Sequence, residues 1–373
     1  MKLTISQPAL IDIISIVSKA VATRTPKPVL TGILLEASTG QLTATAYDLE
    51  LGIQSTITSD DDNRLDVEDA GNIVLPARYF SDVVKKLPAD LVTIQVEANY
   101  MTLIQSGKAQ FHLHGIDADE FPRLPSFDQS RSLNLASDLL NELITSTVFA
   151  TSTLEARPIL TGVNLEFRDQ LLTATATDAL RLARKQTTVE NSEGVEEWSA
   201  VIPGKSFGEL AKLLPPGSDP ITVQFTTSHS LFEIGSTLFY SRLIDGNYPD
   251  TERIIPSGHK TEVAFDLSSL RGAIDRASLI ARDREVRLEV ADDTVVIASN
   301  SPEIGNLSET IDIISKQGDN LTISFNAKYV LDALRAMDMD VVHVYFNGWN
   351  QPFVMRQEGD DFGLQLISPV LMR

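Results

Sequence analysis

The chain has 373 residues, a formal net charge of −20 and no cysteine. This length suits two or three domains, and a content of 43% hydrophobic and 22% charged residues is that of a globular protein rather than a disordered one. The lack of cysteine excludes a disulfide scaffold, cysteine-ligated zinc, iron–sulfur clusters and thiol nucleophiles, and it is compatible with the cytosol.

The first predicted elements are a short strand and an amphipathic helix over 9–24, in which apolar residues recur every three or four positions. Asp12 and Lys19 interrupt this apolar run, so we interpret it as mature structure and not as a signal peptide. No stretch is long and apolar enough to predict a membrane span. A hairpin containing "LTATAYDLELG" (42–52), a short helix over 76–87 and two more strands follow.

These elements recur along the chain. "LTATATDALRL" (172–182) repeats the first hairpin at an offset of 130 residues, and a third copy lies at 286–300. The short helix recurs in "VIPGKSFGELAKLLP" (201–215) and "SFNAKYVLDALRAM" (324–337). We therefore predict an α+β fold of three tandem domains, each with two helices packed on antiparallel sheets.

Proline-rich segments near 120–130 and 247–259 mark the links between these domains. They predict domains over 1–125, 126–255 and 256–373. The remaining helices are predicted at 137–157, 203–214, 268–284 and 326–337.

The charge is unevenly distributed. The six predicted helices contain 14 Lys and Arg against 9 Asp and Glu, whereas the rest of the chain is strongly acidic. One interpretation is that these are ordinary solvated helix faces. The other is a basic surface directed at a polyanion, although the overall acidity taken alone argues against nucleic acid.

Several segments resemble the bacterial DNA polymerase III beta subunit family, the replication sliding clamps, over the whole chain. They are the threefold repeat, "ATDALRL", "DGNYPD" followed by "RIIP", and the C-terminal "ISPVLMR". The resemblance implies a cytoplasmic, non-catalytic homodimer, joined head to tail into a ring around double-stranded DNA. The implied partners are the polymerase III alpha subunit, the clamp loader, and other replication and repair proteins; no cofactor is implied. A ring is retained topologically, so weak phosphate contacts suffice and an acidic exterior is no obstacle.

The resemblance also implies DNA-contacting residues. Arg24 matches a family arginine at the end of the first helix, while Arg78, Lys205 and Lys328 occupy one equivalent position in the three short helices. Arg282 and Arg284 are further candidates, and weaker ones are Lys85, Lys86, Lys212, Arg271 and Arg276.

A peptide-binding pocket is implied between the second and third domains, where partners dock a short peptide of mixed glutamine and aliphatic or aromatic residues. The matching positions are Leu160, Thr177, Arg181, Leu182, Pro249, Arg253, Ile254, Ser368, Pro369, Val370 and Leu371. The alternative is that these residues only close the domain core. The chain departs from the family at Ala179 and Leu180, usually Gly or Ser and then His, and at Leu371, usually Arg, so its peptide preference is in question.

The resemblance places the dimer interface at the strands over 103–113 and 295–305. Lys108 is expected to face Glu303 there, although an exposed ion pair contributes little.

Two rival classes remain open. A repeat scaffold with a peptide groove, unrelated to DNA, would explain the repeat without a ring. A metal-dependent hydrolase could use His112 and His114, which lie on one face of a predicted strand, although such pairs are more often ordinary strand residues. The sequence contains no recognisable catalytic triad and no phosphate-binding glycine loop.

Overall fold

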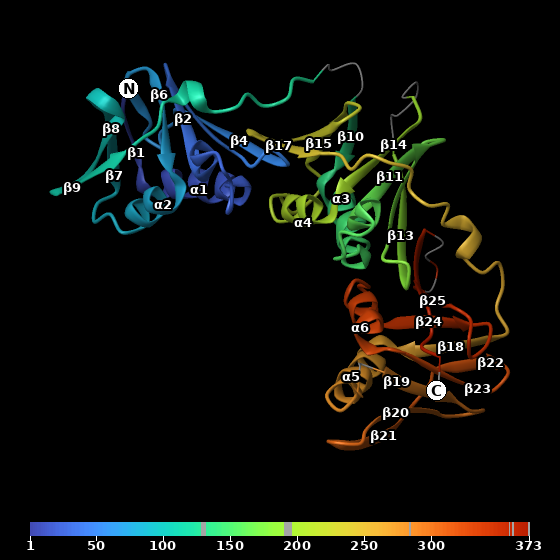
Figure 1. Cartoon of the computed structure of the whole chain (residues 1–373). Coiled ribbons are helices and arrows are strands. Elements are labelled where there is room, and N and C mark those ends of the chain that lie inside the picture. The colour runs from blue at the N-terminus through green and yellow to red at the C-terminus, as the bar shows by residue number, and fades with distance from the viewer. Residues whose placement is uncertain (128–131, 190–195, 283–284, 358, 360–361, 372–373) are drawn as a thin grey trace. The chain divides into compact units, whose positions relative to one another are not determined.

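A computed structural model describes the chain apart from residues 128–131, 190–195, 283–284, 358, 360–361 and 372–373. The chain forms two compact units (Figure 1). The first comprises Met1–Ser137 and Lys212–Leu243, and the second comprises Asp138–Ala211 and Ile244–Arg373. The central repeat therefore contributes strands to both units.

The first unit contains two antiparallel sheets and the helices α1 (Gln7–Val17) and α2 (Ala77–Lys85). The two helices pack against each other, and α1 also packs on β3 and β4. The five-stranded sheet has the order β5 (Asp66–Asp69), β1 (Lys2–Ser6), β7 (Leu91–Val96), β8 (Met101–Ser106) and β9 (Ala109–His114). The eight-stranded sheet has the order β10 (Ser132–Ala136), β15 (Pro220–Phe225), β16 (His229–Ile234), β17 (Thr237–Arg242), β4 (Leu51–Thr58), β3 (Gln41–Tyr47), β2 (Gly32–Ser38) and β6 (Gly71–Pro76).

The second unit repeats this plan. Its helices are α3 (Ser137–Thr145, of which Ser137 belongs to the first unit), α4 (Gly204–Ala211), α5 (Leu267–Ser278) and α6 (Ala327–Arg335). The nine-stranded sheet has the order β14 (Trp198–Pro203), β11 (Gly162–Arg168), β12 (Leu171–Thr177), β13 (Arg181–Thr188), β26 (Gly363–Ile367), β25 (Phe353–Gln357), β24 (Val341–Phe346), β18 (Thr261–Asp266) and β22 (Ser315–Gly318). The four-stranded sheet has the order β21 (Gly305–Ile311), β20 (Val295–Ser301), β19 (Glu285–Val290) and β23 (Leu321–Asn326).

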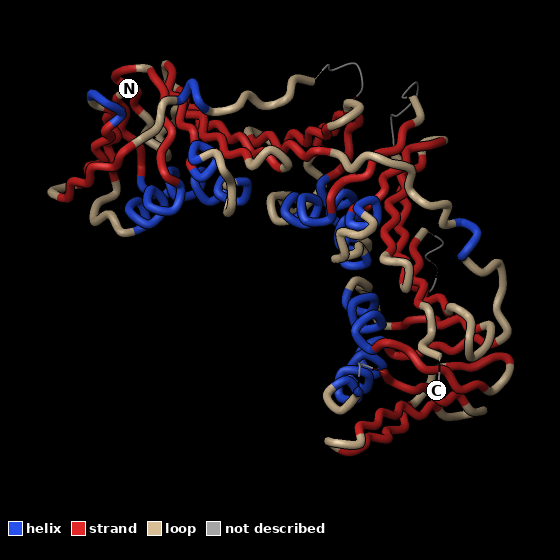
Figure 2. Tube along the Cα trace, viewed as in Figure 1, coloured by secondary structure: helices blue, strands red, loops and turns tan. Residues whose placement is uncertain are grey.

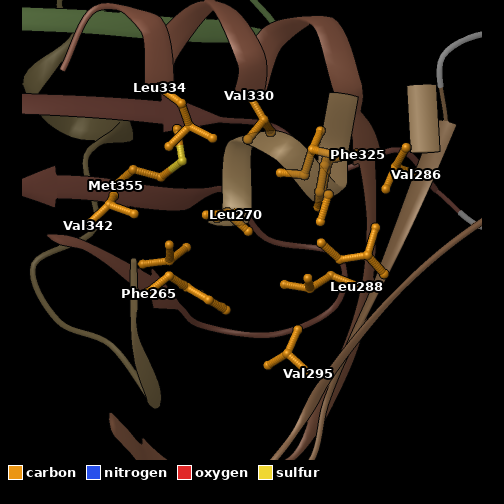
Figure 3. Close-up of a cluster of buried hydrophobic side chains, with 14 of the residues drawn as sticks. Phe265, Leu270, Val286, Leu288, Val295, Phe325, Val330, Leu334, Val342 and Met355 are labelled. Atoms are coloured by element: carbon orange, nitrogen blue, oxygen red, sulfur yellow. The ribbon is translucent and has the colours of Figure 1, made fainter. Parts of the chain in front are cut away.

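The predicted α+β class is confirmed, and within each unit the helices gather on one side of the strands (Figure 2). Figure 3 shows the core of the third repeat, where Leu270 of α5 and Leu334 of α6 point toward Phe265 and Met355 of the sheet. All four side chains are almost fully buried. Burying each such side chain stabilises the fold by about 1.5–3 kcal/mol.

Neighbouring repeats are joined by shared sheets. The strand β4 of the first repeat pairs with β17 of the second, and β13 of the second pairs in the same way with β26 of the third. In each case the last strand of one repeat's hairpin lies beside the last strand of the next repeat. The junctions are therefore continuous backbone ladders, which long-range pairing creates and no local sequence pattern predicts.

The longer helices end earlier than predicted. The helix expected over 9–24 is α1 followed by the 3-10 helix Ser18–Ala20, and the one expected over 137–157 is the nine-residue α3 followed by the 3-10 helix Val148–Ala150. At the end of α3 the Thr147 hydroxyl donates to the Leu143 carbonyl at 2.6 Å. Hydroxyl side chains compete in this way for helix carbonyls, and the periodicity of apolar residues alone does not reveal that the helix ends there.

The three short helices begin one residue after their predicted starts, directly after Pro76, Pro203 and Asn326, and end two or three residues early. The helix expected over 268–284 starts at Leu267 and ends at Ser278. No helix within the described ranges has the length and apolar character that crossing a membrane requires.

Candidate DNA-contact and peptide-binding sites

Three exposed cations occupy the same place in three helices. Arg78, Lys205 and Lys328 are each the second residue of a short helix, α2, α4 or α6. A cation in the first turn opposes the positive end of the helix dipole and costs about 0.3–1 kcal/mol. The repeated placement therefore does not serve helix stability and indicates an external anion.

The cations differ in their partners. Arg24 is exposed in the loop after the first 3-10 helix, and within the described part of the chain Arg24, Arg78 and Lys205 have no ion-pair partner. Lys328 pairs with Asp332, with Nζ 2.5 Å from Oδ2. Arg284 lies outside the described residues.

The excess of basic over acidic residues predicted for the helices is wrong for the α-helices of the structure. The six α-helices contain equal numbers of basic and acidic residues, because the extra cations lie just beyond the shortened helix ends. The basic ones are Arg78, Lys85, Lys205, Arg271, Arg276, Lys328 and Arg335, and the acidic ones are Asp12, Asp82, Asp138, Glu142, Glu209, Asp275 and Asp332. Arg24, Lys86, Lys212 and Arg282 follow helices instead of lying in them.

One of the weaker candidates is already engaged. Arg276 of α5 forms a two-pronged ion pair with Glu309 of β21, at 2.9 Å from Nε and 2.5 Å from Nη2. This hydrogen bond holds the pKa of Glu309 below its usual value and raises the pKa of Arg276. Arg276 thus fastens α5 to the edge strand.

The opening of β13 is a tight turn that gathers several predicted pocket residues. The Thr177 hydroxyl donates to the Arg181 carbonyl at 2.6 Å, and Asp178 Oδ1 accepts from the backbone N–H groups of Leu180 and Arg181 at 2.9 and 3.1 Å. The Ser368 N–H donates to the Leu180 carbonyl at 2.9 Å, so the C-terminal segment lies against the turn.

An apolar floor continues from this turn across the sheet. Leu182, Val354, Leu364 and Leu366 form a buried cluster from adjacent strands, and Ile255 of the inter-domain segment packs on it. Leu180, Ile254 and Leu371 from the neighbouring segments remain exposed. Exposed aliphatic side chains beside a buried apolar floor suit the anchoring of a peptide.

The segment between the second and third domains is held beside the turn. The Thr177 N–H donates to the Tyr248 hydroxyl at 3.1 Å, and burial raises the pKa of Tyr248. Glu252 pairs with Arg184 of β13. These contacts place Pro249 and Ile254 alongside the strand.

The remaining predicted pocket residues differ in accessibility. Leu160 is buried, whereas Arg253 is exposed and pairs with Asp250 at 2.9 Å. Pro369 and Val370 are half-buried, and the Val370 N–H donates to the Ser324 carbonyl of β23 at 2.8 Å.

Arg181 lies at the centre of a buried network. Its Nε is 3.1 Å from Asp178 Oδ2, its Nη1 is 2.8 Å from Asp332 Oδ2, and its Nη2 donates to the Phe149 carbonyl at 2.5 Å. The guanidinium carbon also lies 4.6 Å from the centre of the Tyr329 ring. Asp332 and Tyr329 were not predicted, because they lie about 150 positions away in the chain and have no local motif in common with Arg181.

The predicted interface segments are only partly at sheet edges. The segment 103–113 covers parts of β8 and β9, of which β9 is the outer strand of the five-stranded sheet. The segment 295–305 is mainly β20, an inner strand of the four-stranded sheet, and its edge strand is the neighbouring β21. Lys108 and Glu303 are exposed in the turns that precede β9 and β21. Phe111 and Ile304 are exposed apolar residues at these edges. His112 and His114 are exposed on β9, and no group of side chains in the described ranges could hold a metal ion.

Three tandem domains of this kind, each with two helices backed by antiparallel sheets, define a DNA clamp fold. Family models of the DNA polymerase III beta subunit match the chain over its length, with the N-terminal domain at residues 1–125, the central domain at 134–250 and the C-terminal domain at 252–371.

Individual proteins agree. The beta sliding clamp of Bacillus subtilis strain 168 is 43% identical and that of Staphylococcus aureus strain Mu50 is 39% identical, each with 99% of both chains covered. The crystal structure of the Bacillus subtilis clamp superposes with a TM-score of 0.96 at 42% identity, covering 100% of both chains. The chain therefore belongs to the DNA polymerase III beta subunit family. Its function is that of a DNA sliding clamp, a non-catalytic subunit of the polymerase III holoenzyme that partners with DNA and polymerase.

Proposed function

We propose that two copies of this chain join head to tail into a closed ring around duplex DNA in the cytoplasm. The domain boundaries in this proposal are 1–125, 126–255 and 256–373. The observation that carries it is the pattern of sheet edges. Neighbouring repeats join by pairing one strand from each, and this leaves one such strand without a partner in the first repeat and one in the third.

Within the chain, β4 pairs with β17 and β13 pairs with β26. In the third repeat, the strand equivalent to β4 and β13 is β21. In the first repeat, the strand equivalent to β17 and β26 is β9. Among the described residues, β21 and β9 each pair with a strand on one side only. An exposed strand edge is a ready template for pairing with another chain. Pairing β21 of one copy with β9 of the next, twice, covers both of these edge strands in each copy with twofold symmetry.

The same rule gives a register. Leu51 pairs with Ser241, and Arg181 pairs with Ile367 in the equivalent place. The turn of this hairpin is one residue longer in the third repeat, since Thr177 pairs with Leu182 whereas the equivalent Asn300 pairs with Asn306. The repeat alignment therefore carries these positions to Gly305 on one copy and Leu113 on its partner. This register sets Glu303 opposite Gly115 and Lys108 opposite Thr310, so Lys108 and Glu303 would not face each other directly.

Arg24, Arg78, Lys205, Lys328, Arg282 and Arg284 are the proposed phosphate contacts. They are few for an encircled duplex, and weak contacts allow movement along DNA. The turn at Thr177–Leu182, with Leu160, Pro249, Arg253, Ile254 and the segment Ser368–Leu371, forms the proposed peptide site. It would tether the polymerase III alpha subunit, the clamp loader, and other replication and repair proteins.

Retention on circular DNA tests encirclement. Protein loaded onto a nicked circle should co-elute with the DNA in gel filtration at a salt concentration that removes ordinary contacts. Cutting the circle once should release it within the same buffer. Equal retention on circular and linear DNA would contradict a topological link and support simple adhesion.

A further inference from the structure

A single carboxylate joins the proposed DNA contact to the proposed peptide site. Asp332 Oδ2 lies 2.8 Å from Nη1 of Arg181 and 2.5 Å from Nζ of Lys328. The Asp332 side chain is only 14% exposed, whereas Lys328 is 48% exposed. The buried cation of the pocket and the exposed cation of α6 therefore share one oxygen atom.

The shared carboxylate is held ionised. Burial opposes its ionisation, but hydrogen bonds from Lys328 and Arg181 outweigh that effect and keep the pKa of Asp332 below its usual value. Arg335 lies farther off, at 3.7 Å from Oδ1, and is more exposed. Because a largely buried carboxylate needs a compensating charge, withdrawing one cation strengthens its attraction to the other.

Arg181 transmits the position of Asp332 to the pocket. Its guanidinium is fixed by Asp332, Asp178 and the Phe149 carbonyl, and its backbone carbonyl accepts the Thr177 hydroxyl. The turn that precedes it binds Ser368 of the C-terminal segment. A shift of the guanidinium would therefore move the wall of the pocket.

We propose that Asp332 is a positioning residue for the peptide site, and that Lys328 competes with Arg181 for it. When Lys328 turns to a DNA phosphate, Asp332 binds Arg181 alone and the pocket wall becomes firmer. Encircled DNA and bound peptide then strengthen each other's binding, as linkage requires. This inference rests on the proposed function, in which Lys328 contacts DNA and the turn at Thr177–Leu182 binds peptide.

The experiment measures binding of a fluorescein-labelled peptide of glutamine, leucine and phenylalanine residues to full-length clamp, free and loaded on nicked circular DNA. We expect the wild type to bind the peptide about fivefold or more tightly on DNA, at the lower end of couplings between sites. Lys328→Met should bind it tightly in both states, and Asp332→Asn weakly in both. Loss of the difference in both variants is a readout that a purely structural role would not produce.

Asp178→Asn is the matched control. Asp178 has the same exposure as Asp332, also pairs with Arg181, and does not contact Lys328. This variant should bind the peptide less tightly but still bind it more tightly on DNA than free. If Asp332→Asn fails to fold, the test is whether Lys328→Met alone abolishes the effect of DNA on peptide affinity.

The outcomes separate the two proposals. Peptide binding by the wild type with no DNA effect, or a DNA effect that survives in Lys328→Met, overturns the shared-carboxylate inference alone. No peptide binding by the wild type at all overturns the pocket proposal and this inference with it.

Discussion

Ala179 holds a left-handed backbone conformation, with φ of 78°, in the turn proposed to form the pocket wall. Leu49 occupies the equivalent turn of the first repeat with φ of 79°. In both turns an aspartate caps the following N–H groups, Asp48 in the first and Asp178 in the second. Glycine adopts this backbone conformation without strain, whereas a residue with a side chain, such as Leu49 or Ala179, is strained in it.

Replacing Ala179 by glycine should therefore stabilise the protein. Relief of a left-handed non-glycine residue contributes about 1–2 kcal/mol, and the added freedom of the unfolded chain takes back about 0.4–1 kcal/mol. We expect a net gain of about 0.5–1 kcal/mol in urea unfolding, and a similar gain for Leu49→Gly. The control is Ala174→Gly in the middle of β12, which should destabilise; a loss of stability in all three would refute the strain argument.

Individual residues show where sequence reasoning stops. The candidate pocket residues at 177–182 could be named from the family resemblance, because they lie close together in the chain. The burial of Arg181 could not, because its compensating groups Asp332, Phe149 and Tyr329 come from distant elements.

At the scale of the elements, the cations at the helix starts lower the stability of the helices, and the proposed contact with DNA explains their placement. Arg78→Gln and Lys205→Gln together should raise the free energy of unfolding slightly, by up to about 0.3–1 kcal/mol per site, because each removes a charge repelled by the helix dipole. The same variant should bind DNA less tightly, and the slope of log affinity against log salt should become shallower by about 0.9 per lost phosphate contact.

Lys260→Gln is the charge control for each single substitution, since Lys260 is exposed directly before β18 and away from the helix ends. If it changed the salt slope as much as Arg78→Gln or Lys205→Gln alone, total charge, and not the helix starts, would govern DNA binding.

The C-terminal segment permits a separate test of the pocket. Deleting 369–373 removes the Val370 bond to β23 and the half-buried Pro369 beside the turn. Loss of one anchoring wall should weaken the labelled peptide by about 2 kcal/mol or more, at least about thirtyfold. Leu279→Ala, which removes another highly exposed leucine, should leave peptide affinity unchanged. Unaltered affinity after the deletion would remove the C-terminal segment from the peptide site.

An element could be predicted when the residues that determine it lie close together in the sequence. The hairpins and the starts of α2, α4 and α6 follow from alternation and from the residues that precede the helices. The helix ends were not predicted, since hydroxyl side chains such as that of Thr147 decided them. The strand pairs between repeats depend on backbone groups that every sequence carries alike.

For the whole molecule, the sheet edges provide the most specific prediction. The proposed register places Ser308 of β21 opposite Gln110 of the partner's β9. Opposed residues in antiparallel strands have Cα atoms about 4.5–5.5 Å apart, which suits a disulfide. Because the chain has no cysteine, Ser308→Cys with Gln110→Cys introduces the only thiols. Mild oxidation should convert the protein to covalent dimer on a non-reducing gel.

A pair shifted by two residues, Ser308→Cys with His112→Cys, is the register control. Diagonal neighbours on paired strands lie about 7–8 Å apart, beyond the span of an unstrained disulfide. It should cross-link slowly or not at all. Faster cross-linking of the shifted pair would show that the strands meet in another register.

The in-register variant also separates a ring from a clasp that merely adheres to DNA. Loaded on a nicked circle and then oxidised at both junctions, it should become a covalent ring linked through the circle. Because no bond to DNA is involved, detergent and high salt should fail to remove it, whereas a single cut in the circle should release it at once. Unoxidised protein should be lost in detergent from either form of DNA, since the subunits then separate. Release of the oxidised protein from intact circles would mean that the two junctions close without DNA inside, and encirclement would be excluded even though the dimer stands.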